Sequence, residues 1–173
     1  MSLAPAFIDP RLAITVPFEV VSLKGNEDMP DALRPLTEKG RRRFRKTARA
    51  FARLGRKVNL ILTSPLVRAV QTAEILADAL GVSQVLVRGE LDLDRASAPG
   101  LEALCRAVGP GWALVGHNPS LAETLARLVG RAGEPPRFRK GAAAALRMSD
   151  SGTLPWTLAW MAAPGRKPTT EVD

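Results

Sequence analysis

Residues 58–68 read VNLILTSPLVR, and this stretch decides the fold. The near-continuous apolar run over residues 58–63 predicts a β-strand that is covered on both faces. Ser64 and Pro65 follow as a helix N-cap and a first-turn proline, and the helix that they open is expected to run through Ala79. A buried strand that passes directly into a helix indicates an α/β domain.

The same alternation of strands and helices continues on both sides of this stretch. The four-alanine run 142–145 suits a helix by propensity, but its place between two loops favours a strand. Together the segments predict an α/β domain with a largely parallel sheet and helices on both faces. The remaining expected strands are 18–23, 85–87, 112–115, 141–148 and 156–161, and the remaining expected helices are 37–54, 99–108 and 120–128.

The length of 173 residues, 46% of them apolar, fits one domain with a substantial core. Three prolines within residues 1–17 predict an extended N-terminal arm, because proline interrupts regular helix. The domain is expected to span residues 18–162, with a loose tail over residues 163–173. Cys105, the single cysteine, is expected to be a small core residue.

The chain has no apolar run of the roughly 18 residues that a membrane span requires, and its N-terminus lacks the pattern of a secretory signal. We therefore expect a cytoplasmic protein that does not enter a membrane. The sequence does not indicate an oligomeric state.

The net charge of +8 favours anionic partners, and much of the surplus lies in the basic segment 41–57. Apolar residues at helical spacing within this segment favour a solvated helix face, and an acidic protein or polyphosphate partner is the alternative. Nucleic acid is disfavoured, because no aromatic residues interleave with the basic ones and the chain has no tyrosine.

Three candidate site residues follow predicted strands, at the sheet edge where ligands of α/β proteins collect. Arg68, in the first turn of its helix, can bind an anion through its planar guanidinium. His117, the only histidine, can donate to a phosphoryl oxygen when it is protonated. Glu90 can act as a general acid if burial raises its pKa. Each residue alone would be expected to be structural, and their convergence on one edge makes a site the better interpretation.

Three motifs together resemble the histidine phosphatase (phosphoglycerate mutase-like) superfamily, and within it the short SixA-type phosphohistidine phosphatases. They are RPLTEKG at 34–40, LTSPLVRAVQT at 62–72 and VGHNPS at 115–120. The resemblance implies a three-layer α/β sandwich and a phosphohistidine formed on a histidine of an Arg-His-Gly motif that closes the first strand. It implies that Arg68 clamps the phosphoryl group, that His117 stabilises its charge, and that Glu90 is the proton donor.

The chain departs from this family at the first strand. Ser22-Leu23-Lys24-Gly25 stands where Arg-His-Gly is expected, and no histidine precedes His117. Lys24 can contact an anion, but an ammonium with an ordinary pKa of about 10.4 is protonated at neutral pH and cannot attack phosphorus.

The sequence therefore predicts a SixA-like domain that binds phosphate, a phosphoprotein or another acidic ligand through Arg68, His117 and Lys24, with impaired or absent turnover. Three alternatives stay open: an active phosphatase with an unorthodox nucleophile or a directly attacking water, a scaffold that docks an acidic partner through residues 41–57, and an altered N-terminus upstream of Arg34. Neither a metal nor another cofactor is implied, because the chain has no Cys/His ligand cluster and no glycine-rich phosphate loop.

Overall fold

The protein is described by a computed structural model, which covers residues 12–17, 29–53, 58–138, 141–149, 151 and 153–163. Its elements follow in the order β1 (Leu12–Pro17), η1 (Asp31–Leu33), α1 (Glu38–Arg53), β2 (Leu60–Thr63), α2 (Val67–Leu80), β3 (Gln84–Val87), η2 (Gly89–Leu91), α3 (Ala98–Val108), β4 (Trp112–Gly116), α4 (Ser120–Leu128), β5 (Ala143–Arg147) and β6 (Thr157–Ala162).

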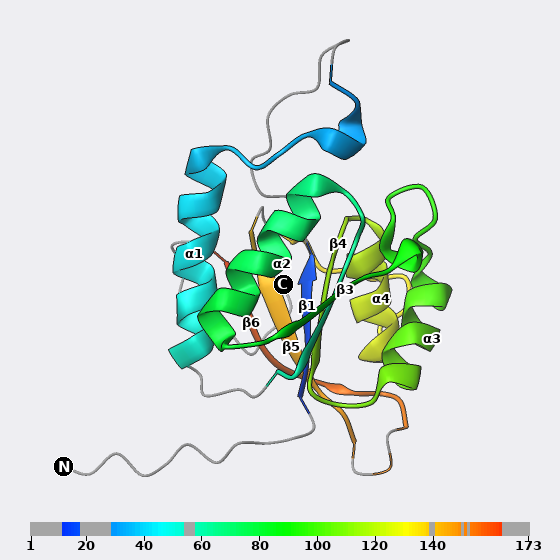
Figure 1. The fold of residues 1–173 in the computed structure, drawn as a ribbon. Helices are drawn as coiled ribbons and strands as arrows, with labels where there is room; N and C mark the ends of the chain where they lie inside the picture. The colour runs from blue at the N-terminus through cyan, green and yellow to red at the C-terminus, as the bar shows by residue number, and fades with distance from the viewer. Residues whose placement is uncertain are drawn as a thin grey trace, which may run out of the picture.

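The six strands form one sheet in the order β3-β2-β4-β1-β5-β6. The pairings among β3, β2, β4 and β1 are parallel, and those of β1 with β5 and of β5 with β6 are antiparallel. The sheet lies between α1 and α2 on one side and α3 and α4 on the other (Figure 1). The expected α/β sandwich with a mostly parallel central sheet is confirmed.

Strand β4 explains how one sheet supports two helical layers. Ala113 and Val115 pack into the core with α1 and α2, whereas Trp112 and Leu114 pack into the core with α3 and α4. All five residues of β4 are buried, because the side chains of a strand alternate between the two faces and both faces are covered. Cys105 is fully buried in the second core, as expected, and burial raises the pKa of its thiol to about 12.

The first strand lies earlier in the chain than its apolar pattern indicates. The prediction placed it at residues 18–23, after an arm ending at residue 17, but the structure places β1 at Leu12–Pro17, between β4 and β5. The prolines were misleading, because Pro17 ends the strand and does not interrupt it. The prediction of an arm is therefore wrong for residues 12–17. The predicted strand at 18–23 lies outside the described residues, as do residues 1–11 of the arm and all of the expected tail 163–173 except residue 163.

Most other elements agree with the sequence to within a few residues. The Thr37 hydroxyl accepts the Gly40 N–H at 3.0 Å as the expected cap of α1, and the alanine run forms the buried strand β5. In contrast, α2 begins at Val67 and not at Ser64, so Ser64 is not its N-cap. None of the helices that the structure describes is long and apolar enough to cross a membrane.

Candidate anion-binding site

The candidate site lies at the carboxyl ends of β2 and β4, which are parallel neighbours. Thr63 ends β2 beside Val115 in β4, so Ser64 and His117 both emerge at the same edge of the sheet. The Ser64 N–H donates to the Val115 carbonyl oxygen at 2.9 Å and continues the pairing by one residue. This register brings two polar side chains together from segments that are 53 residues apart in the sequence.

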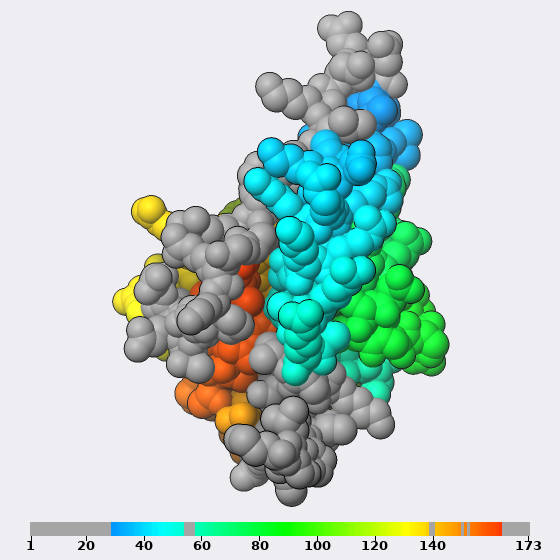
Figure 2. All heavy atoms as spheres, turned by 90° about the vertical axis from the view of Figure 1, so that its left-hand side faces the viewer, coloured from blue at the N-terminus to red at the C-terminus, as the bar shows by residue number. Residues whose placement is uncertain are grey.

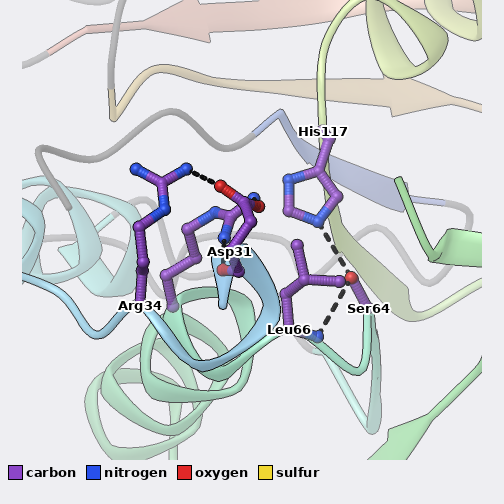
Figure 3. A network of polar contacts seen from close by, with 6 residues as sticks. Asp31, Arg34, Ser64, Leu66 and His117 are labelled. Carbon is purple, nitrogen blue, oxygen red and sulfur yellow. Dashed lines mark hydrogen bonds and ion pairs between the residues drawn. The ribbon is translucent and has the colours of Figure 1, made fainter. Parts of the chain in front are cut away.

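Ser64 and His117 form a buried polar pair. The Ser64 Oγ lies 2.8 Å from the His117 Nε2, and the Leu66 N–H donates to the same Oγ at 3.3 Å (Figure 3). Ser64 is fully buried and His117 is 5% exposed. The hydroxyl that the sequence assigned to a helix cap is therefore bonded to the imidazole, because α2 starts only after Ser64 has completed the strand pairing.

Arg68 points back from the first turn of α2 and holds Asp31 of η1. Its Nη1 donates to the Asp31 main-chain oxygen at 2.7 Å, and its Nη2 donates to Asp31 Oδ2 at 2.8 Å. Arg34 binds the other carboxylate oxygen of Asp31, so one carboxylate lies between two guanidinium groups (Figure 3). Arg68 is buried, and both of its terminal nitrogens are engaged by Asp31.

The charges around the site act on both Asp31 and His117. Burial tends to raise the pKa of Asp31, but hydrogen bonds from Arg68 and Arg34 outweigh burial and lower it below its usual value. Burial and then the positive charge of Arg68 lower the pKa of His117 to about 4, against the opposing effects of Asp92 and Asp31. The ligand-free imidazole is therefore neutral at pH 7, and not protonated as the sequence-based interpretation assumed.

Glu90 is placed differently from the residues around His117. It lies in η2, its side chain is 51% exposed, and it accepts from Arg88 Nη2 at 2.6 Å. The hydrogen bond from Arg88 lowers the pKa of Glu90, whereas a general acid at neutral pH needs a raised one. It lines a separate hollow with Arg95 and Ser97. The condition under which Glu90 was expected to donate a proton is therefore not met.

Lys24, the third expected anion contact, lies outside the described residues, as do Leu23 and Gly25. The end of β1 is described, and Pro17 pairs with Gly116, the residue before His117. The first strand that the structure describes thus ends at Pro17, earlier in the chain than the Ser22–Gly25 segment considered from the sequence.

Two acidic residues near the site were missed by sequence analysis. Asp31 was not among the candidate site residues, and its three-residue spacing to Arg34 is the one signal that would have indicated a pair. Asp92 follows η2 and acts on the charge of His117, but it has no sequence signal that sets it apart from Glu90. Over the described ranges, no group of three or more His, Cys, Asp and Glu side chains is arranged to hold a metal ion.

A family profile and a curated relative both match this chain. The profile of the Histidine phosphatase superfamily (branch 1) matches residues 22–92. An uncharacterised protein of Picosynechococcus sp. is 38% identical over 121 residues, which make up 68% of this chain and 73% of that protein.

Solved structures match over nearly the whole chain. A structure of the protein histidine phosphatase SixA complexed with tungstate is 26% identical, with a TM-score of 0.71 over 88% of this chain and 97% of that chain. A candidate SixA phosphohistidine phosphatase from Agrobacterium tumefaciens shares the fold at 23% identity, with a TM-score of 0.76 over 90% of this chain and 99% of that chain. Residues 22–92 thus match the profile of the histidine phosphatase superfamily, and the chain, with Arg68 and His117 at the sheet edge where the motifs placed them, has the fold of the SixA-type members of that superfamily.

Proposed function

We propose that this protein binds phosphate or a phosphorylated or acidic ligand at Arg68 and His117, with impaired or absent turnover. The observation that carries the proposal is the pair of hydrogen bonds from Arg68 to Asp31, one of them to the carboxylate. A buried guanidinium beside a buried imidazole already holds an anionic group at the edge where α/β proteins bind ligands.

The expectation of impaired turnover rests on the single histidine. The resemblance implies a histidine nucleophile at the end of the first strand, and neither Val16-Pro17-Phe18 nor Ser22–Gly25 contains a histidine. The profile match also begins only at residue 22, after β1 has ended. Covalent phosphoryl transfer needs an unprotonated nucleophile, which a lysine with an ordinary pKa of about 10.4 does not supply at neutral pH. We therefore propose Lys24 only as a further anion contact.

The alternative is an active phosphohistidine or phosphomonoester phosphatase that uses an unorthodox nucleophile or a water molecule. The neutral state of His117 favours this alternative, because a neutral imidazole can accept a proton from an attacking group. Turnover therefore has to be measured together with binding.

The test combines an anion-binding assay with two turnover assays. Tungstate, the anion present in the SixA structure with the same fold, is titrated by calorimetry against the full chain and against Arg68→Ala and His117→Ala. The same proteins are assayed with a generic aryl phosphate and with a phosphohistidine protein. We expect binding that Arg68→Ala removes and no turnover. Turnover that either substitution abolishes would contradict the impaired site, and an absence of tungstate binding would contradict the site itself.

A groove between α1 and α2 favours a second candidate, the docking of an acidic partner. It encloses about 520 Å³, and its lining includes Arg41, Arg45 and Arg49 from α1. These arginines lie one helical turn apart and form a basic row along the helix. Figure 2 looks onto this side of the molecule, where α1, in cyan, runs along the middle of the view. Glu74 and Asp78 of α2 line the opposite wall and would repel part of an acidic ligand.

Charge reversal separates the two candidates. Reversing Arg41, Arg45 and Arg49 together should abolish a salt-dependent interaction with polyphosphate if the groove is the site. The matched control reverses the same number of charges outside the groove lining, at Arg42, Arg43 and Lys46. Polyphosphate binding that survives the first triple change but not Arg68→Ala would assign it to the anion site.

A further inference from the structure

The contact between Ser64 and His117 restricts the orientation of the serine hydroxyl as well as the position of the imidazole. Both side chains are buried, and the serine makes hydrogen bonds through both its backbone and its hydroxyl. Its N–H donates to Val115 in β4, and the Leu66 N–H donates to its Oγ. The hydroxyl therefore has little freedom to turn away from His117 Nε2, which lies 2.8 Å from it.

The hydrogen-bonding capacity of the hydroxyl decides which imidazole nitrogen carries the proton. A serine hydroxyl has one proton to donate, and a buried donor without an acceptor is unfavourable. Ser64 Oγ already accepts from Leu66, and among the described residues the acceptor in contact with it is His117 Nε2. A nitrogen that accepts cannot also carry a proton, so the proton of the neutral ring must be on Nδ1.

The free nitrogen lies on the ligand side of the ring. In Figure 3 the ring edge that is not turned toward Ser64 faces the side on which Asp31 lies, where the carboxylate is held. An Nδ1–H on that side can donate to an oxygen of a bound anion without any extra proton on the ring. The assignment also explains how a histidine that stays uncharged at pH 7 can still contribute to anion binding.

We propose that Ser64 is a positioning residue that holds His117 in its Nδ1–H tautomer, so that the neutral ring donates Nδ1–H to an oxygen of the phosphoryl ligand gripped by Arg68. The ligand half of this proposal rests on the proposed function. The tautomer half does not, because it follows from the ligand-free contacts of Ser64.

The single histidine makes the tautomer directly measurable. In ¹⁵N-labelled protein the two-bond ¹H–¹⁵N correlations of the imidazole all belong to His117, so no assignment by mutation is needed. In the wild-type protein at pH 7 we expect a protonated Nδ1 and an unprotonated Nε2. A predominant Nε2–H tautomer in the wild-type protein would overturn the proposal before any variant is made.

Two serine variants separate positioning from packing. Ser64→Ala removes the hydroxyl, and we expect its spectrum to move toward the Nε2–H tautomer. Ser64→Thr keeps a hydroxyl and should restore the Nδ1–H pattern. Far-UV circular dichroism and thermal unfolding establish that each variant is folded. A folded Ser64→Ala protein that keeps the wild-type tautomer would show that the serine only packs, and would contradict the proposal.

Tungstate titration tests the ligand half. We expect Ser64→Ala to bind tungstate about tenfold more weakly, the scale of one lost hydrogen bond to a charged group, and Ser64→Thr to bind close to wild type. A shifted tautomer with unchanged tungstate affinity would overturn the ligand half. An Nδ1–H wild type that binds no tungstate would support the tautomer assignment and overturn the proposed function, so the two failures are distinguishable.

Discussion

His117 is held in a neutral state by its surroundings, and this has a consequence for stability. Its pKa falls from the ordinary 6.5 to about 4 in the folded protein, so folding favours the unprotonated ring. The stability that depends on the neutral ring is complete above pH 6.5 and is lost as the pH falls toward 4, because the unfolded chain then binds a proton that the folded protein excludes.

We expect this residue to change the free energy of unfolding by up to about 3 kcal/mol between pH 6.5 and pH 4. Urea unfolding at a series of pH values measures the change. Carboxylates titrate in part of the same range, so His117→Gln serves as the reference, and the difference between the two proteins isolates the histidine. Parallel curves for the two proteins would show that the imidazole is not desolvated as the structure indicates.

Asp31 places a negative charge where an anionic ligand would bind. Asp31→Asn removes the charge but keeps a side-chain oxygen that can accept from Arg68, as Asp31 Oδ2 now does. We expect tungstate affinity to rise roughly fivefold, because a half-exposed ion pair contributes at most about 1 kcal/mol. Calorimetric titration gives the affinity. A weaker affinity would mean that the carboxylate mainly orients Arg68.

At the scale of elements, the turn between β4 and α4 depends on a close approach at Gly116. A Cβ at this position would lie 3.2 Å from both Leu91 Cδ2 and Leu121 Cδ1, closer than ordinary packing allows. The absence of a side chain lets η2 and α4 pack against the strand end that carries His117.

We expect Gly116→Ala to lower the free energy of unfolding by about 1–3 kcal/mol, the usual cost of extra volume in a packed core. Gly89→Ala is the matched control, because its Cβ would meet only the Arg95 guanidinium at an ordinary 3.6 Å. Chemical unfolding of the two variants compares them. Equal stabilities would show that Leu91 and Leu121 can move aside without cost.

At the scale of the whole molecule, β1 lies inside the sheet and not at its edge. It pairs in parallel with β4 and antiparallel with β5, so it joins the parallel strands to the antiparallel pair β5 and β6. Removing it would leave unpaired backbone groups on two buried strands.

We therefore expect a chain that lacks residues 1–17 to lose its cooperative thermal unfolding transition. A chain that lacks residues 1–11 keeps β1 whole and serves as the control, and we expect it to retain the transition. Differential scanning calorimetry of the two truncated proteins makes the comparison. A folded protein without residues 1–17 would mean that the segment is an arm after all.

Local patterns in the sequence were sufficient for most of the architecture. The runs at 58–63 and 112–115 predict buried strands because an unbroken apolar run fits a strand covered on both faces, and β2 and β4 lie there. The motifs placed Arg68 and His117 at one sheet edge, because the carboxyl ends of parallel strands meet there. The position of β1 was beyond this reasoning, since the three prolines within residues 1–17 and the apolar segment that follows made residues 18–23 the more regular candidate.

The sequence by itself determined the α/β class, the family motifs and the presence of one histidine. Only the tertiary structure decided the partners of those residues: that Ser64 binds His117 and does not cap a helix, that Asp31 lies between Arg34 and Arg68, and that Glu90 pairs with Arg88. The physical reason is that helices and strands follow from contacts between near neighbours in the chain. Hydrogen bonds, burial and pKa values at the site depend instead on strand register and on which distant segments meet.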